Sequence, residues 1–241
     1  MQQVDVKAQI KALREKRKKL TGRQNRQGFT AQKVEFYKPI YDKPIVQQKD
    51  PYKSYAAAGI PKRYYDMSFE WLRKNGHFPE ENKEAYAVVK SYVDNLEQNL
   101  ASGKGLILRG PAGTGKTSIA ISVLKKAIEL GKGCMMISMP SLLDTMLTLS
   151  KGPNDVYLSY EQKIRNIPIL LLDDFGAEYS KSEWVNAKVD DIIIDRYNKM
   201  KPIILTTNYG DEWTKENYSQ RVYDRLRGEY TEAIFMGKSH R

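Results

Sequence analysis

One stretch of eight residues, GPAGTGKT at positions 110–117, combines the side chains and the backbone freedom that a phosphate site needs. It fits the pattern G-x-x-x-x-G-K-[ST], in which loop N–H groups surround phosphates, the lysine reaches the β- and γ-phosphates, and the hydroxyl holds Mg²⁺. The sequence therefore predicts a nucleotide site here. The residues predicted to bind the nucleotide are Gly110, Pro111, Ala112, Gly113, Thr114, Gly115, Lys116 and Thr117.

Two adjacent acids end a second stretch, IPILLLDDFGAE, where Asp173 and Asp174 follow an apolar run typical of a buried strand. Burying both carboxylates unpaired would be costly, so a functional use is favoured. A carboxylate at a strand end beside a phosphate loop can hold the Mg²⁺ shell, and its neighbour can orient or deprotonate the attacking water. We assign Asp173, with Thr117, to the metal, and Asp174 to the water.

Two further stretches carry groups suited to a γ-phosphate. Asn208 follows the apolar run PIILTT, where its amide can hydrogen-bond both a phosphate and a water. The alternative is an Asn-Tyr-Gly turn that only ends the strand. Arg221 and Arg225 lie one turn apart on a predicted helix, and arginine stabilises phosphoryl charge. Because Arg225 next to Asp224 can make a merely local ion pair, Arg221 is the candidate.

The segments between these groups alternate between strand and helix periods, as a β-α-β architecture requires. Strands are expected at 105–109, 133–139, 168–173, 202–207 and 230–236. Helices are expected at 83–101, 116–130, 184–199 and 219–227, with helical segments between 141 and 166. Continuous apolar strands are typical of a parallel sheet covered on both faces. The fold class is therefore α/β, doubly wound, with the phosphate loop between a strand and a helix.

Composition limits the remaining possibilities. The chain of 241 residues is 41% apolar, which suits one or two soluble domains. The single cysteine, Cys134, lies in an apolar run and is expected to be a core thiol, with no disulfide or cysteine-rich zinc site within one chain. Neither a signal peptide nor a membrane span is expected, which predicts a cytoplasmic protein. The net charge of +11 favours polyanionic partners, nucleic acid first and an anionic membrane surface a distant second.

Most of this charge lies near the N-terminus, where residues 1–27 carry +7 of the +11. Their apolar spacing predicts a basic amphipathic helix that docks onto a partner, although a solvated helix without a partner fits the same pattern. Residues 28–60 contain frequent prolines, which predict an extended linker. We therefore expect a partner-binding segment over 1–58 and a globular domain over 59–241.

Taken in order, GPAGTGKT, LLLDDFGAE, ILTTN and RVYDRL resemble the AAA+ ATPases of the DnaC/DnaI helicase-loader and IstB transposase-helper group. The resemblance covers about residues 59–237 and includes GIPKRYYDMSFEWL, which is similar to the segment near the adenine in that group. It implies ATP hydrolysis, with Asp173 and Asp174 as the Walker B pair, which holds the metal and the water. It also implies that Asn208 is sensor 1, which contacts the γ-phosphate, and that Arg221 is the arginine finger, which completes a neighbour's site in a homo-oligomer.

The resemblance further implies a loader that binds a DnaB-type replicative helicase, here through residues 1–27, and delivers it to single-stranded DNA. A reduced or absent C-terminal lid fits this group, whereas the zinc-binding N-terminal domain of DnaI-like loaders cannot be copied with one cysteine. The helical insertion after the second strand is expected to contact DNA. Its candidate residues are Lys151, Tyr157, Tyr160, Lys163 and Arg165.

Three alternatives remain beside the loader. An IstB-like transposase helper would keep the fold and act on duplex DNA. An adaptor that uses ATP only as a structural switch would not hydrolyse it, and Asp174 argues against this. A small-molecule kinase would need only the phosphate loop, but Asn208 followed by RVYDRL, without a recognisable substrate lid, disfavours it.

Overall fold

Five parallel strands form the centre of the computed structural model, which describes residues 50–177 and 183–237. The strands are β1 (Gly105–Arg109), β2 (Cys134–Ser138), β3 (Ile169–Asp173), β4 (Ile203–Thr207) and β5 (Tyr230–Ile234). Their order across the sheet is β2-β3-β4-β1-β5, and each neighbouring pair is parallel. Every residue of the central strands β1, β3 and β4 is buried, as their continuous apolar runs predict. The predicted α/β class is confirmed.

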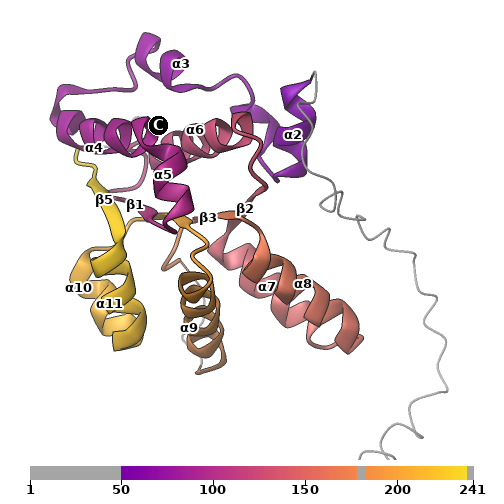
Figure 1. Cartoon of the computed structure of the whole chain (residues 1–241). Helices are drawn as coiled ribbons and strands as arrows, with labels where there is room; N and C mark the ends of the chain where they lie inside the picture. The colour runs from indigo at the N-terminus through magenta and orange to yellow at the C-terminus, as the bar shows by residue number, and fades with distance from the viewer. Residues whose placement is uncertain (1–49, 178–182, 238–241) are drawn as a thin grey trace, which may run out of the picture. The chain divides into compact units, whose positions relative to one another are not determined.

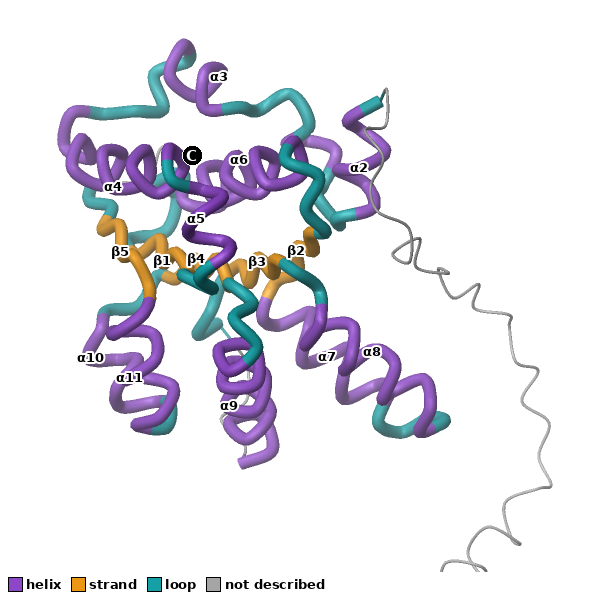
Figure 2. Tube along the Cα trace, in the orientation of Figure 1, coloured by secondary structure: helices purple, strands orange, loops and turns teal. Residues whose placement is uncertain are grey.

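Helices cover both faces of this sheet (Figures 1 and 2). One face carries α2 (Pro51–Ala57), α3 (Phe69–Lys74), α4 (Lys83–Asp94), α5 (Leu96–Ala101) and α6 (Lys116–Glu129), with short 3-10 turns at Lys62–Tyr64 and Glu80–Asn82. The other face carries α7 (Met139–Leu149), α8 (Asn154–Asn166), α9 (Glu183–Asn198), α10 (Asp211–Asn217) and α11 (Gln220–Glu229).

The alternation of side chains along each strand explains the two layers. Leu106 and Leu108 of β1 are buried in the core under α4 and α6, whereas Ile107 between them belongs to the core under α9 and α11. Successive side chains of a strand point to opposite faces, so one apolar strand supplies both cores. The sheet therefore separates α6, which begins at the phosphate loop, from α11.

Two differences from the predicted helices have local causes. The helix expected over 83–101 is divided at Asn95, whose side-chain amide donates to the carbonyl of Ser91 at 2.9 Å and so competes with the helical backbone pattern. The helix α10 was not predicted, because it begins after Gly210 in a polar stretch and is only seven residues long.

The prediction of an extended linker over 28–60 is wrong for the C-terminal part of that range, because residues 51–57 form α2. The Asp50 side chain accepts a hydrogen bond from the Tyr52 N–H at 3.0 Å, and Pro51 occupies the first helical position, which suits proline. Tyr55 is buried, so the folded domain includes residues from Asp50 rather than beginning near Gly59. Residues 1–49, with the predicted basic helix over 1–27, lie outside the described residues.

Cys134 opens β2 and is buried, and this burial raises the pKa of its thiol. The prediction of a core thiol is confirmed. Within the described ranges, no helix combines the length and the apolar content that a bilayer crossing requires.

Candidate functional site

The phosphate loop connects the end of β1 to the start of α6. Gly110, Gly113 and Gly115 have φ angles of 148°, 82° and 86°, which side chains disfavour. A Cβ on Gly110 would lie 2.2 Å from the carbonyl oxygen of Phe235 on the neighbouring chain segment. The glycines of the motif are therefore required by the backbone path of the loop.

The N-terminus of α6 faces this loop with its backbone donors. Gly115 is the N-cap and provides no side-chain capping bond, and the first turn holds no acidic residue. Such a terminus attracts phosphate through its N–H groups and the helix dipole. Lys116 is buried, and its Nζ donates to the carbonyls of Gly110 and Pro111, each at 2.7 Å. Its ammonium group thus lies against the loop that would hold the phosphates.

The predicted metal residues meet although they are far apart in the sequence. Thr117 Oγ1, in the first turn of α6, donates to Asp173 Oδ1, at the end of β3, at 2.9 Å. Thr206 Oγ1, on the adjacent strand β4, donates to the same carboxylate oxygen at 2.6 Å. Two hydroxyl groups therefore orient Asp173 toward the start of α6.

The oxygen pair of Thr117 and Asp173 fits Mg²⁺. Magnesium prefers octahedral oxygen ligands at about 2.1 Å, so two neighbouring ligand oxygens lie about 3 Å apart. The observed separation is 2.9 Å. Among the described residues no group of three or more His, Cys, Asp or Glu gathers as a metal cage. A Mg²⁺ site does not need such a cage, because one or two carboxylates can act with phosphate and water.

Asp174 turns away from the strand direction. Its φ is 55°, a left-handed conformation that is uncommon for residues other than glycine, and the residue is exposed. Its backbone N–H donates to Thr206 Oγ1 at 3.0 Å. The single hydroxyl of Thr206 therefore contacts both adjacent acids, one through its side chain and the other through its backbone.

Thr206 is a residue that the sequence reasoning missed. Its signal was the polar pair Thr206 and Thr207 at the end of an otherwise apolar strand. The pairing of Leu172 with Leu205 across β3 and β4 places the next residues, Asp173 and Thr206, side by side.

A second missed residue is Lys125 on α6, whose Nζ donates to the carbonyls of Tyr65 and Met67 at 2.9 and 2.6 Å and to the Tyr64 carbonyl.

Asn208 follows β4, the strand that lies between β3 and β1, so the sheet places it at the same edge as Asp173 and the phosphate loop. The residue is exposed. Behind it, Tyr209 N–H donates to Thr207 Oγ1 at 3.2 Å, and Thr207 Oγ1 donates to the Phe175 carbonyl at 2.7 Å. The segment after β4 is thus fastened to the segment after β3.

Arg221 lies apart from this group, on α11. It is exposed and lines a hollow of about 450 Å³ with Asp190 and Asp191 of α9. Arg225, one turn later, lies over the Tyr197 ring, with 4.6 Å between Cζ and the ring centroid. Arg225 is therefore engaged inside the chain, whereas Arg221 faces solvent. The structure brings together the phosphate loop, Asp173, Asp174 and Asn208, but it does not bring Arg221 to them.

Two of the residues expected to contact DNA, Arg165 and Lys163, are less accessible than the sequence suggests. Arg165 is hydrogen-bonded within the protein and Lys163 is partly buried. Arg165 donates to Glu161 Oε1 at 3.0 Å and to the Asp191 carbonyl at 2.9 Å. Burial lowers the pKa of Lys163. Lys151, between α7 and α8, is exposed. Lys151 is therefore the more accessible cation for a polyanion.

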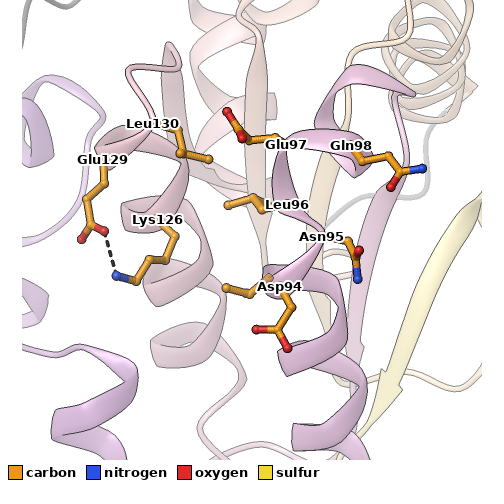
Figure 3. A pocket seen from close by; sticks show the side chains of 9 residues that line it. Asp94, Asn95, Leu96, Glu97, Gln98, Lys126, Glu129 and Leu130 are labelled. Carbon is orange, nitrogen blue, oxygen red and sulfur yellow. Dashed lines mark hydrogen bonds and ion pairs between the residues drawn. The ribbon is translucent and has the colours of Figure 1, made fainter.

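A separate hollow of about 490 Å³ lies between the α4–α5 junction and the C-terminal end of α6 (Figure 3). Lys126, which lines it, is ten residues beyond Lys116 on the same helix, or about 15 Å at 1.5 Å per residue. This hollow is consequently distinct from the phosphate loop.

Comparison with known proteins gives one family and several relatives. Residues 91–226 match the family model described as IstB-like ATP binding protein. The chain is 24% identical over 190 residues to the replicative helicase loader DnaC of Escherichia coli (strain K12), covering 78% of this chain and 75% of that protein. It is 29% identical over 137 residues to the replicative helicase loader DnaI of Bacillus subtilis (strain 168), covering 55% of this chain and 41% of that protein.

Among solved structures, a crystal structure of the DnaC helicase loader superposes with a TM-score of 0.62 and 25% identity. The match covers 73% of this chain and 99% of that one.

Proposed function

Because this chain belongs to the IstB-like ATP binding protein family, we propose that it is an ATPase that loads a DnaB-type replicative helicase onto single-stranded DNA. Nucleotide binding follows from the family, and hydrolysis is part of the proposal. The contact of Thr117 Oγ1 with Asp173 Oδ1, at 2.9 Å beside the N-terminus of α6, carries the ATPase proposal.

Each residue at the sheet edge has a proposed role. The glycine-rich loop and Lys116 bind the phosphates of ATP, and Thr117 and Asp173 hold Mg²⁺, which would neutralise phosphate charge when bound. Asp174 orients or deprotonates the attacking water, and its exposure supports access to that water. Asn208 contacts the γ-phosphate. These roles are consistent with the family and with the meeting of the strand ends.

The helicase and DNA parts of the proposal rest on the relatives and on charge. DnaC, which is named a replicative helicase loader, aligns over 75% of its own length. The net charge of +11 favours association with DNA. We propose that residues 1–27 bind the helicase and that 59–241, together with α2, form the ATPase domain.

We further propose that the active form is a homo-oligomer in which Arg221 completes the ATP site of a neighbouring subunit. The location of α11 on the sheet face opposite α6 supports this, because the finger and the phosphate loop of one chain then lie in different layers. An arginine supplied in this way makes hydrolysis depend on assembly.

A loading assay tests the proposal. A DnaB-type helicase is incubated with circular single-stranded DNA, the full chain and ATP, and DNA-bound helicase is counted. The expected result is more bound helicase with the full chain than without it, and ATP hydrolysis that single-stranded DNA stimulates. Stimulation by duplex DNA without helicase transfer would contradict the loader and favour a transposase helper. Binding of ATP without turnover would favour the non-hydrolysing adaptor.

A further inference from the structure

Arg109 ends β1 directly before the phosphate loop, and its side chain is only 9% exposed. Its guanidinium group contacts two stretches that are distant from it in the sequence, β5 and residues 209–214. Nε donates to Glu232 Oε1 on β5 at 2.5 Å, and Nη1 donates to the carbonyl oxygen of Tyr209 at 2.5 Å. The longer contacts are 3.4 Å from Nη1 to Thr214 Oγ1 and 3.9 Å from Nη2 to Asp211 Oδ1.

These contacts hold the Arg109 side chain in one orientation. Arg109 thereby links the end of β1 to β5 and to the segment after β4. A buried guanidinium group requires a compensating anion, which Glu232 supplies. Because the guanidinium is planar and its donors point in fixed directions, the bond to Glu232 also fixes the direction of the donor that reaches Tyr209. The end of β1 is thereby held at one distance from the segment after β4.

Tyr209 is the residue next to Asn208, and its ring connects that segment to the Asp174 turn. The ring stacks on Trp213 with 4.0 Å between centroids. Gly176 lies so close that a Cβ there would be 2.6 Å from the Tyr209 ring. A shift of Tyr209 would therefore displace Asn208 and also the turn that carries Asp174.

We propose that Arg109 is a positioning residue for ATP hydrolysis, which fixes Asn208 and the Asp174 turn relative to the phosphate loop of the same subunit. The inference rests on the proposed ATPase function. The Arg109 guanidinium donates to protein groups of β5 and of the segment after β4, so its effect is on the rate of hydrolysis rather than on phosphate binding. A misplacement of about 1 Å can cost about 100-fold in rate.

The test compares Arg109→Met and Arg109→Lys with the wild-type full chain. Both variants should bind ATP within about threefold of the wild-type Kd, whereas kcat should fall by about 10- to 100-fold, as expected for small misplacements. Arg109→Lys keeps a cation beside Glu232 but cannot donate in two fixed directions. It therefore separates lost positioning from a lost ion pair. Arg73→Met, on the exposed surface of α3, makes the same change elsewhere and should keep the wild-type kcat.

A mixing experiment locates the effect. Subunits with Lys116→Ala retain Arg109 and Arg221 and are added to the Arg109→Met protein in the presence of single-stranded DNA. Hydrolysis should stay low, because the working phosphate loops belong to subunits without Arg109. Recovery of activity would place the effect on the neighbour's site and overturn the proposal.

Three other results would overturn it. Both Arg109 variants could keep the wild-type kcat, Arg109→Lys could restore it in full, or ATP affinity and Tm could fall together with kcat. The first result would mean that Arg109 does not affect the rate of hydrolysis. The second would mean that only the charge of Arg109 matters, and the third that Arg109 stabilises the fold rather than positioning Asn208 and the Asp174 turn. A wild-type chain that does not hydrolyse ATP would overturn the proposed function first and the inference with it, so the two failures are distinguishable.

Discussion

At the scale of single residues, the edge of the sheet is organised by side-chain oxygens. Asp173 Oδ1 accepts hydrogen bonds from Thr117 and Thr206, at 2.9 and 2.6 Å. The Thr206 hydroxyl also accepts from the backbone N–H of Asp174. One acid is thus turned toward the phosphate loop and the other is left exposed at a left-handed turn. Adjacent residues of the same type consequently have different surroundings, which suits different roles.

Lys116→Ala and Asp174→Asn should separate binding from hydrolysis. Loss of the lysine removes the cation at the phosphate loop, so ATP binding should weaken or vanish. Asp174→Asn leaves the loop and the Thr117–Asp173 pair unchanged, so ATP should bind while turnover falls by about 100-fold or more, the range of a general base. Equilibrium ATP binding and steady-state hydrolysis measure both. If Asp174→Asn hydrolyses ATP at the wild-type rate, the role that we propose for the Asp174 carboxylate is wrong.

At the scale of elements, the order of the strands places the chemistry. β4 lies between β1 and β3, so the residues after these three strands share one edge. α6 leaves that edge on one face of the sheet, and α11 packs on the other face (Figure 1). The elements that carry the phosphate loop and Arg221 are therefore separated by the sheet.

Arg221→Ala should bind ATP normally and hydrolyse it slowly, because a correctly placed arginine finger contributes about 10³–10⁵ in rate. Mixing it with Lys116→Ala and single-stranded DNA should restore part of the activity, since some interfaces then pair a working loop with a working arginine. Arg225→Ala is the comparison, because Arg225 lies over Tyr197 within the chain. Arg225→Ala should lower Tm. Mixing Arg225→Ala with Lys116→Ala should not restore activity. If the mixture with Arg221→Ala stays inactive while both proteins co-assemble, the role across subunits is wrong.

The α7–α8 hairpin should contribute phosphate contacts through Lys151, which is exposed between the two helices. Affinity for single-stranded DNA falls with salt on a log–log plot, with a slope of about −0.7 for each neutralised phosphate. Lys151→Ala should make the slope shallower by about 0.7 if the residue contacts one phosphate. Lys74→Ala, on α3 of the opposite layer, removes the same charge and should leave the slope unchanged. Equal slopes for both variants would place the DNA site elsewhere.

At the scale of the whole molecule, the folded domain extends further toward the N-terminus than the proline-rich sequence suggests. Tyr55 and Ala58 are buried in the same core as α4 and α6. The Ala58 carbonyl accepts from the Met136 N–H of β2 at 2.7 Å, and Lys125 Nζ lies 4.8 Å from the centre of the Tyr55 ring. The first helix of the described chain is therefore part of the folded domain and not of a linker.

Two truncations test this boundary and the proposed docking segment together. Removal of residues 1–49 should leave ATP binding and Tm near the wild-type values while capture of a DnaB-type helicase is lost. Removal of residues 1–58 should also lower the free energy of unfolding by about 2–4 kcal/mol, because it removes a buried tyrosine and its neighbours. Chemical denaturation and helicase pull-down provide the measurements. Full helicase capture without residues 1–49 would contradict the docking proposal.

The sequence by itself determined the phosphate loop, the five strands and the α/β class. Each of these is a local pattern: the glycines of residues 110–117 permit φ angles that other residues avoid, and continuous apolar runs such as IPILLL are typical of buried parallel strands. The predicted strand limits differ from the observed ones by at most two residues. The extent of α2 was not determined in this way, because its single proline, Pro51, suits both a linker and a first helical turn.

Only the tertiary structure decided which side chains meet. Thr206 and Arg109 carry no motif of their own, and their contacts with Asp173 and Tyr209 span 33 and 100 residues of sequence. Such contacts depend on the order and register of the strands, which the apolar pattern does not specify, since the same buried strands could be placed in another order. The engagement of Arg225 with Tyr197 and of Arg165 with the Asp191 carbonyl was likewise set by how α8, α9 and α11 pack.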